Sequence, residues 1–92
     1  MVQEGHLLAV FNSAHRVMKA EGLLKELGVP ILLIPAPRQL QTDCGLALRF
    51  CESDREAVMH ILEQNQLLPA FVSMLKEGAF VTVWDEQVKQ ST

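Results

Sequence analysis

The sequence predicts an α+β domain, because short apolar runs alternate along the chain with two segments of helical periodicity. The clearest strand signal is at 46–51, where Leu46, Leu48 and Phe50 alternate with three other residues. The clearest helix signal is at 14–27, where apolar residues recur at steps of three and four and a glycine follows. We expect the order strand, helix, strand, strand, helix, strand.

Length and composition limit the number of domains and the kinds of partner. A chain of 92 residues buries enough surface for one core, so we expect a single domain over residues 1–92 with its core at about 6–84. The net charge is −3 and 21% of the residues are charged. No broad basic surface is indicated, and we therefore expect no nucleic-acid partner.

The longest apolar segment, residues 29–36, is too short to cross a membrane and contains Pro30 and Pro35. The N-terminal region carries Glu4 and no cleavable hydrophobic stretch, which argues against secretion. We expect a cytoplasmic protein with no membrane association. In a reducing compartment its two cysteines are thiols.

The first strand is expected at 6–11, followed by a helix that begins after Asn12-Ser13, because these two residue types cap helices. Gly28 follows the last apolar position of that helix and is typical of a helix end. Gly22 lies inside the helix, where glycine costs about 1 kcal/mol relative to alanine. Close packing against a neighbour and simple tolerance are both open explanations.

The second strand is expected at 29–35, and its prolines favour an edge position, where an open face could meet another subunit. After a polar loop comes the third strand at 46–51. Ser53-Asp54-Arg55-Glu56 then matches a capping box, which predicts a second helix that ends near Asn65.

The end of the chain is less clearly patterned. Residues 69–77 read as a helix or as a strand, with helical spacing fitting slightly better. Residues 80–84 are rich in β-branched and aromatic side chains and are expected to form the last strand. A short polar C-terminal extension follows Asp85.

This order of elements is the βαββαβ plan of ferredoxin-like domains, in which two helices pack on one face of an antiparallel sheet. In that plan the start of the first helix, residues 12–15, faces the loop between the second and third strands. That loop carries Arg38 and Cys44. Cys44 also shares the alternation of the third strand, so its side chain is expected on the helix-bearing face.

Cys44 is the candidate reactive residue, because a nearby guanidinium such as that of Arg38 favours the thiolate form of a thiol. The N-terminus of the first helix, at Ser13, carries a partial positive charge that would also favour the thiolate. Gly45 would let other groups approach the cysteine, whereas Asp43 opposes the thiolate unless its side chain turns away to cap the loop. Each residue also has a structural alternative: Cys44 as a small buried side chain, Arg38 as a solvated charge, and Ser13 as a helix cap alone.

The sequence contains no motif that would bind a metal ion or a cofactor. Two cysteines lie about 20 Å apart along one strand if it is extended, which is too far for a disulfide within the chain. The cysteines and histidines have none of the tight spacings of zinc sites, and no phosphate-binding glycine loop is present. We expect no metal and no cofactor. The cysteines and histidines whose spacing was considered are His6, His15, Cys44, Cys51 and His60.

Several short motifs carry a resemblance to a known family. They are Phe11-Asn12-Ser13, Ala20-Glu21, Leu24-Lys25 with Gly28, Leu33-Ile34-Pro35-Ala36-Pro37-Arg38, and Asp43-Cys44-Gly45-Leu46-Ala47-Leu48-Arg49-Phe50. Over about residues 7–65 the chain resembles the putative selenium/sulfur carrier protein-like family. The resemblance implies that Cys44 carries sulfur or selenium as a persulfide or selenosulfide.

Three features depart from the family pattern. Ala14 stands where a threonine is common, Gly22 stands where a lysine is usual, and the tail from Leu67 is longer than the usual final strand. None of these affects Arg38 or Cys44.

The sequence therefore leads to two hypotheses about function. In the first, Cys44 relays sulfur or selenium between a donor and an acceptor protein, and the chain is a carrier without turnover of its own. In the second, the chain is an interaction or regulatory module that pairs with a partner, most simply as a homodimer, through the strand at 29–34. Cys44 is then structural or a redox sensor.

Overall fold

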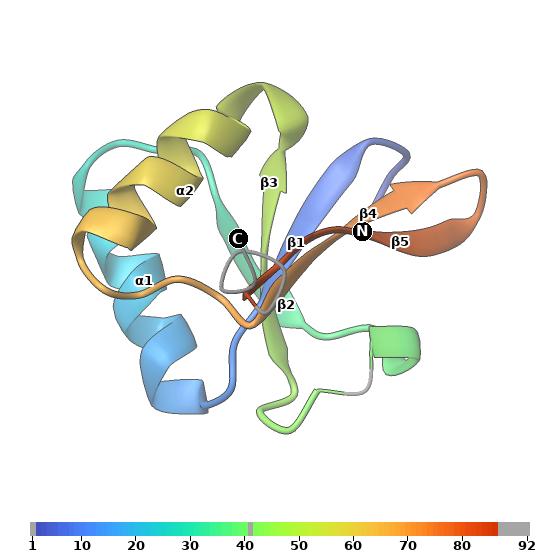
Figure 1. The fold of residues 1–92 in the computed structure, drawn as a ribbon, viewed down its shortest axis with the longest axis horizontal. Helices are drawn as coiled ribbons and strands as arrows, with labels where there is room; N and C mark the ends of the chain where they lie inside the picture. The colour runs from blue at the N-terminus through green and yellow to red at the C-terminus, as the bar shows by residue number, and fades with distance from the viewer. Residues whose placement is uncertain (1, 41, 87–92) are drawn as a thin grey trace.

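The computed structural model describes residues 2–40 and 42–86, and within them two α-helices pack beside one antiparallel sheet (Figure 1). The sheet has five strands in the order β2-β3-β1-β4-β5. In chain order the elements are β1 His6–Val10, α1 Ala14–Glu26, β2 Leu32–Pro35, η1 Arg38–Leu40, β3 Leu46–Cys51, η2 Glu52–Asp54, α2 Arg55–Gln64, β4 Phe71–Lys76 and β5 Ala79–Asp85. The predicted α+β class is confirmed.

The predicted last strand at 80–84 is confirmed as β5, which forms a hairpin with a further strand, β4 (Figure 1). Of the two interpretations of 69–77, the strand is confirmed and the slightly favoured helix is wrong: β4 pairs with β1 on one side and with β5 on the other. The hairpin turns at Glu77 and Gly78, whose φ angles are 51° and 80°. Positive φ at both turn residues matches the twist of paired strands, so this two-residue turn commits both segments to the sheet. The predicted ferredoxin-like order is therefore not confirmed, since the sheet has five strands where four were expected.

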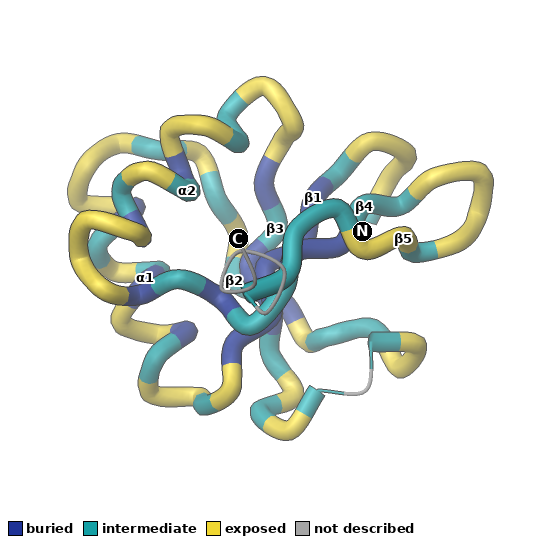
Figure 2. The backbone as a smooth tube through the Cα atoms, in the orientation of Figure 1, coloured by how far each residue is buried: buried dark blue, intermediate teal, exposed yellow. Residues whose placement is uncertain are grey.

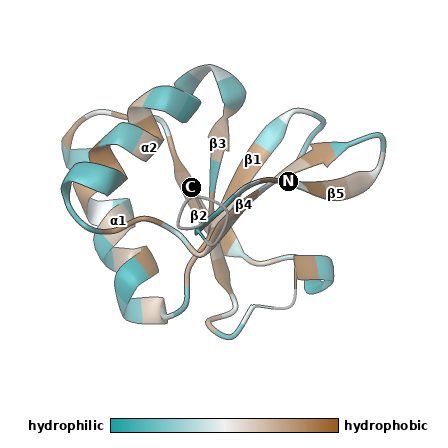
Figure 3. Ribbon diagram, in the orientation of Figure 1, coloured by the Kyte–Doolittle hydropathy of each residue, from teal (hydrophilic) through white to brown (hydrophobic). Residues whose placement is uncertain are grey.

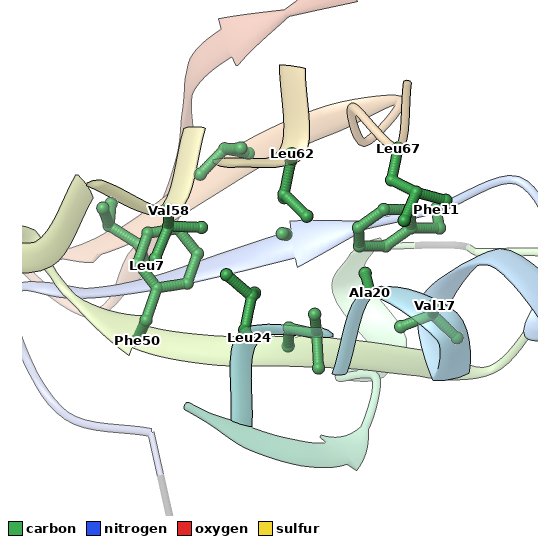
Figure 4. Packing of buried hydrophobic residues seen from close by; sticks show 12 residues of the cluster. Leu7, Phe11, Val17, Ala20, Leu24, Phe50, Val58, Leu62 and Leu67 are labelled. Atoms are coloured by element: carbon green, nitrogen blue, oxygen red, sulfur yellow. The ribbon is translucent and has the colours of Figure 1, made fainter. Parts of the chain in front are cut away.

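Both α-helices cover the same face of the sheet and share one hydrophobic cluster with it (Figure 4). Alternate residues of β1 and β3 point toward the helices, as the period of two in a strand requires. Figure 2 shows the buried positions in the middle of the domain, and Figure 3 shows hydrophilic residues on the outer turns of both helices. The buried members are Leu7, Ala9, Phe11, Val17, Ala20, Leu24, Leu48, Phe50, Val58, Leu62, Leu67 and Val72.

The opposite face of the sheet has a smaller cluster of its own. Its buried residues are Leu8, Val10, Ile34 and Ala47, and the partly buried Val2, Ala36, Leu40, Phe71 and Phe80 pack against them. Two of these residues, Ala36 and Leu40, belong to the connection between β2 and β3. That connection therefore folds back over the sheet face that the helices leave free.

The first helix starts and ends as predicted. Ser13 is its N-cap, and its Oγ accepts a hydrogen bond of 3.2 Å from the backbone N–H of Arg16. Gly28 has a φ of 78°, which explains why a glycine follows the helix.

The predicted capping box at the start of the second helix is wrong. Ser53 lies in the 3-10 turn η2, and the N-cap of α2 is Asp54, whose side chain makes no capping hydrogen bond. The 3-10 turn after β3 uses residues 52–54 and moves the helix start beyond Ser53. The predicted end is confirmed, since Asn65 is the C-cap.

None of the helices formed by residues 2–40 and 42–86 is both long enough and apolar enough to span a bilayer.

Close packing does not explain Gly22. This residue is exposed on α1, and a Cβ atom added there would meet nothing within 4 Å. The helix therefore tolerates the glycine.

Gly22→Ala should raise the free energy of unfolding by about 0.5–1 kcal/mol, because alanine loses less backbone entropy in a helix. Urea denaturation followed by circular dichroism measures the change. Gly28→Ala is the matched control: its φ of 78° strains any other residue, so this variant should lose stability. A Gly22→Ala variant less stable than the wild type would contradict the expectation.

The turn between β4 and β5 is held by a carboxylate from the N-terminal segment. Glu4 accepts hydrogen bonds from the backbone N–H groups of Glu77 at 2.7 Å and Gly78 at 3.1 Å. These two bonds, the one from Glu77 first, lower the pKa of Glu4 below its ordinary value of 4.5. A lowered pKa means that the ionised carboxylate contributes stability above pH 4.5 and loses it as the pH falls through the lower, folded-state value.

Glu4→Gln should therefore be less stable than the wild type at neutral pH, and the difference should shrink as the pH falls below about 4.5. Unfolding free energies measured from neutral to acidic pH test this. Glu26→Gln makes the same change at an exposed carboxylate on α1. If the two variants follow the same pH course, the bonds to the turn carry no pH-dependent stability.

Candidate functional site

The connection between β2 and β3, which we call the cysteine loop, consists of residues 36–45. Its ends are closed by a hydrogen bond of 2.9 Å from the Ala36 N–H to the Gly45 carbonyl. Leu40 N–H donates to the Pro37 carbonyl at 3.0 Å and forms the turn η1. Gly45 has a φ of 72°, and a Cβ atom there would meet nothing within 4 Å. Glycine is thus needed here for its backbone conformation, and no group of the described chain approaches its Cβ position.

Cys44 lies at the end of this loop, just before β3. Its side chain is half-buried and packs, together with Leu46, against the helix-side cluster. This is the face that the alternation along the strand predicts. The cysteine loop thus passes from one face of the sheet, where Leu40 packs, to the other face, where Cys44 packs.

Neutral polar groups surround the Cys44 sulfur. Sγ lies 3.2 Å from the Leu46 carbonyl oxygen and 3.4 Å from the Phe11 carbonyl oxygen, and both can accept the S–H hydrogen. The Leu46 N–H at 3.5 Å donates to the sulfur. The site therefore offers acceptors to a protonated sulfur and a donor to a sulfur that has lost its proton.

Thr42 is the residue that the sequence analysis missed. Its Oγ1 accepts hydrogen bonds from the backbone N–H groups of Cys44 at 3.1 Å and Gly45 at 3.2 Å, and it lies 3.3 Å from Cys44 Sγ. A hydroxyl has two acceptor sites and one hydrogen. With both acceptor sites occupied by N–H groups, the hydroxyl hydrogen can point to the sulfur. The signal was present in the sequence as a threonine two residues before the cysteine, the spacing of a side-chain-capped turn.

Asp43 does not cap the loop. Its side chain is exposed and makes no hydrogen bond or ion pair with residues 2–40 or 42–86. Thr42 fills the position in which the sequence analysis allowed Asp43 to act.

Arg38 lies in η1 and is exposed. Its guanidinium makes no hydrogen bond or ion pair within the described parts of the chain, and it is absent from the polar surroundings of Cys44 Sγ. The structure therefore does not bring together the arginine and the thiol. Their contact was expected because both residues lie in one short loop.

The start of α1 does meet the cysteine loop at one end of the sheet, as the topology predicts (Figure 1). The contact is made by the Phe11 carbonyl oxygen, two residues before Ser13. The Ser13 hydroxyl caps the helix through Arg16. The group that the chain before α1 presents to the sulfur is thus the negative end of a peptide dipole.

The second cysteine is remote from this site. Cys51 is exposed at the far end of β3, opposite His6 of β1, and both cysteines are free. Among the described residues, no three His, Cys, Asp or Glu side chains gather in a way that could hold a metal ion.

Fold and loop together define a small α+β domain that presents one half-buried cysteine at an end of its sheet. A comparison with protein-family models matches residues 6–73 to the family described as "Putative Se/S carrier protein-like", and the chain belongs to that family. The match runs from β1 into β4 and includes the whole cysteine loop. Comparisons with curated proteins and with solved structures found no match.

Thr42→Val keeps the size of the side chain but removes its three polar contacts. We expect a loss of about 1 kcal/mol in the free energy of unfolding. Amide hydrogen exchange followed by NMR should show faster exchange at Cys44 and Gly45, whose N–H groups lose their acceptor. Thr42→Ser is the control, since it keeps the hydroxyl. Unchanged exchange in Thr42→Val would contradict the role of Thr42.

Proposed function

We propose that this protein is a sulfur or selenium carrier, with the cargo held on Cys44 as a persulfide or selenosulfide. The observation that carries the proposal is the position of Cys44 within the segment that matches the carrier family. The chain relays its cargo between a donor and an acceptor protein and has no turnover of its own. Its two free cysteines suit a reducing compartment, and we place the protein in the cytoplasm.

Loading is a thiol exchange that needs no outside oxidant. The Cys44 thiolate attacks the terminal sulfur of a persulfide on the donor, the donor's S–S bond breaks, and its electron pair leaves on the donor thiolate. A new S–S bond forms on Cys44, and the proton lost by Cys44 goes to the departing thiolate. Delivery to the acceptor is the same exchange with Cys44 as the leaving group.

The surroundings of the sulfur support both states of this cycle. The Thr42 hydroxyl and the Leu46 N–H can donate to the sulfur while it is anionic. The Phe11 and Leu46 carbonyl oxygens can accept from the S–H group of the unloaded thiol. Half-burial limits contact between the bound persulfide and free thiols in solution, which would otherwise remove the cargo.

In this proposal the supporting residues have separate tasks. Gly45 allows the backbone to place Cys44 on the helix side, and Ser13 holds the start of α1 beside the loop. Arg38 is exposed in the same loop and is available to an anionic group on a donor or acceptor protein. Asp43 is exposed next to Cys44, where it faces an arriving partner.

One observation favours the alternative, in which the chain is an interaction module. The strand β2 lies at an edge of the sheet, and the side chain of Leu32 is 43% exposed there. An edge with an exposed apolar residue can pair with a second copy of the chain. In this reading Cys44 is structural or a redox sensor.

Loading distinguishes the two functions. After treatment with a low-molecular-weight persulfide and removal of excess reagent, Cys51→Ser, which keeps Cys44, should retain the mass of one added sulfur atom. Cys44→Ser, which keeps the exposed Cys51, should retain none, because free thiols reach that residue. Intact-mass spectrometry measures both, and the double variant gives the background. The carrier proposal fails if Cys51→Ser stays unmodified or if the two single variants retain equal amounts of sulfur.

A further inference from the structure

The Cys44 thiol lies at the place where β1 ends and β3 begins. The ladder between these two antiparallel strands stops at the pair Val10 and Ala47. The Val10 carbonyl accepts a hydrogen bond of 2.8 Å from the Ala70 N–H on the β4 side. Successive carbonyls along an extended chain point to opposite edges, so the carbonyl of Phe11 points to the β3 side.

The sulfur takes the place of the next pair in the ladder, which would join Phe11 to Leu46. The Leu46 N–H donates to Sγ at 3.5 Å, and the S–H group donates to the Phe11 carbonyl oxygen at 3.4 Å. The Leu46 carbonyl oxygen, 3.2 Å away, competes for the same hydrogen. A side-chain thiol therefore connects the two strands where backbone groups would otherwise meet. We call Phe11, Cys44 and Leu46 the thiol junction.

A sulfur that has formed an S–S bond cannot maintain this junction. It no longer has the hydrogen that it donated. An S–S bond is about 2.05 Å long, so an added sulfur pointing at either carbonyl oxygen would lie within roughly 1.5 Å of that oxygen, far inside contact distance. The side chain must turn away or the strands must separate. In both cases the Phe11 carbonyl loses its hydrogen bond to the sulfur.

The Phe11 carbonyl lies next to the start of α1. Its peptide group joins Phe11 to Asn12, one residue before the N-cap Ser13. Ser13 holds the first amides of the helix: its Oγ accepts from the Arg16 N–H and its carbonyl from the Val17 N–H, both at 3.2 Å. The Phe11 ring is buried in the helix-side cluster and is held there. A rotation of the peptide group is therefore taken up by Asn12 and Ser13.

We propose that loading of Cys44 opens the thiol junction and loosens the start of α1, so that the empty and the loaded carrier present different surfaces to their partners. A donor that prefers the closed form and an acceptor that prefers the open form would each bind the carrier at the correct stage. This use rests on the proposed function. The coupling itself applies to any S–S bond formed at Cys44.

The test attaches a small group to Cys44 by a reaction that requires no carrier activity. Cys51→Ser, which keeps Cys44 as its one cysteine, is treated with methyl methanethiosulfonate in urea and then refolded. The thiolate attacks the sulfenyl sulfur, methanesulfinate leaves with the electron pair of the broken bond, and the thiol proton goes to the buffer. Intact mass verifies one methylthio group, and circular dichroism verifies folding.

Amide hydrogen exchange followed by NMR then compares the labelled with the unlabelled protein. Exchange at Arg16 and Val17 should become about threefold faster or more, because Ser13 is held less firmly. Leu27, at the other end of α1, is the control: its N–H donates to the Leu23 carbonyl at 3.1 Å, and its exchange should stay nearly unchanged. Removal of the label with dithiothreitol should restore the original rates.

Two further variants, made in the Cys51→Ser background, separate the loss of the hydrogen from the added bulk. Cys44→Ala has no donor and no added atom, and it should also speed exchange at Arg16 and Val17. Cys44→Ser keeps a donor and should do so less. If the labelled chain does not refold, the comparison of Cys44→Ala with its parent decides the matter.

The proposal is overturned if exchange at Arg16 and Val17 is the same with and without the label, or if Leu27 speeds up by the same factor. For the variants, equal exchange in Cys44→Ala and its parent has the same meaning. None of these results depends on whether Cys44 retains sulfur from a persulfide, which is the test of the carrier proposal. The two proposals can therefore fail separately.

Discussion

The burial of β1 on both faces is the constraint on which the rest of the structure depends. From Leu7 to Phe11 every residue is at most 2% exposed, and alternate side chains enter the cluster under the helices and the smaller cluster behind the sheet. β1 lies between β3 and β4, so its backbone groups are paired on both edges. Because β1 has no open face or edge, the packing on both faces of the sheet depends on the register in which β1 pairs with β3 and β4.

This double burial also decides the shape of the cysteine loop. The face of the sheet away from the helices needs a cover, and the loop supplies Ala36 and Leu40 for it. The chain must then return to the helix side to begin β3, and it does so through Thr42, Cys44 and Gly45. The cysteine lies where the chain changes face, which explains why polar backbone groups surround a side chain that is half-buried.

In the carrier proposal, sulfur is exchanged at the end of the sheet where β3 begins, among neutral donors and acceptors. The family match ends within β4, so the strand that supplies Trp84 lies beyond the matched segment.

The sequence by itself determined the elements whose signals are local. The cap at Ser13, the glycine after α1 and the alternation along β3 each follow from a few neighbouring residues, and each agrees with the structure. The position of Cys44 on the helix side followed from the same alternation. Tertiary structure alone decided the rest. Residues 71–76, whose local pattern fits a helix or a strand, are a strand because β1 and β5 supply hydrogen bonds on both edges. Likewise Arg38 points to solvent and Thr42 meets the sulfur, because the path of the loop depends on the cluster that Leu40 joins on the other face of the sheet.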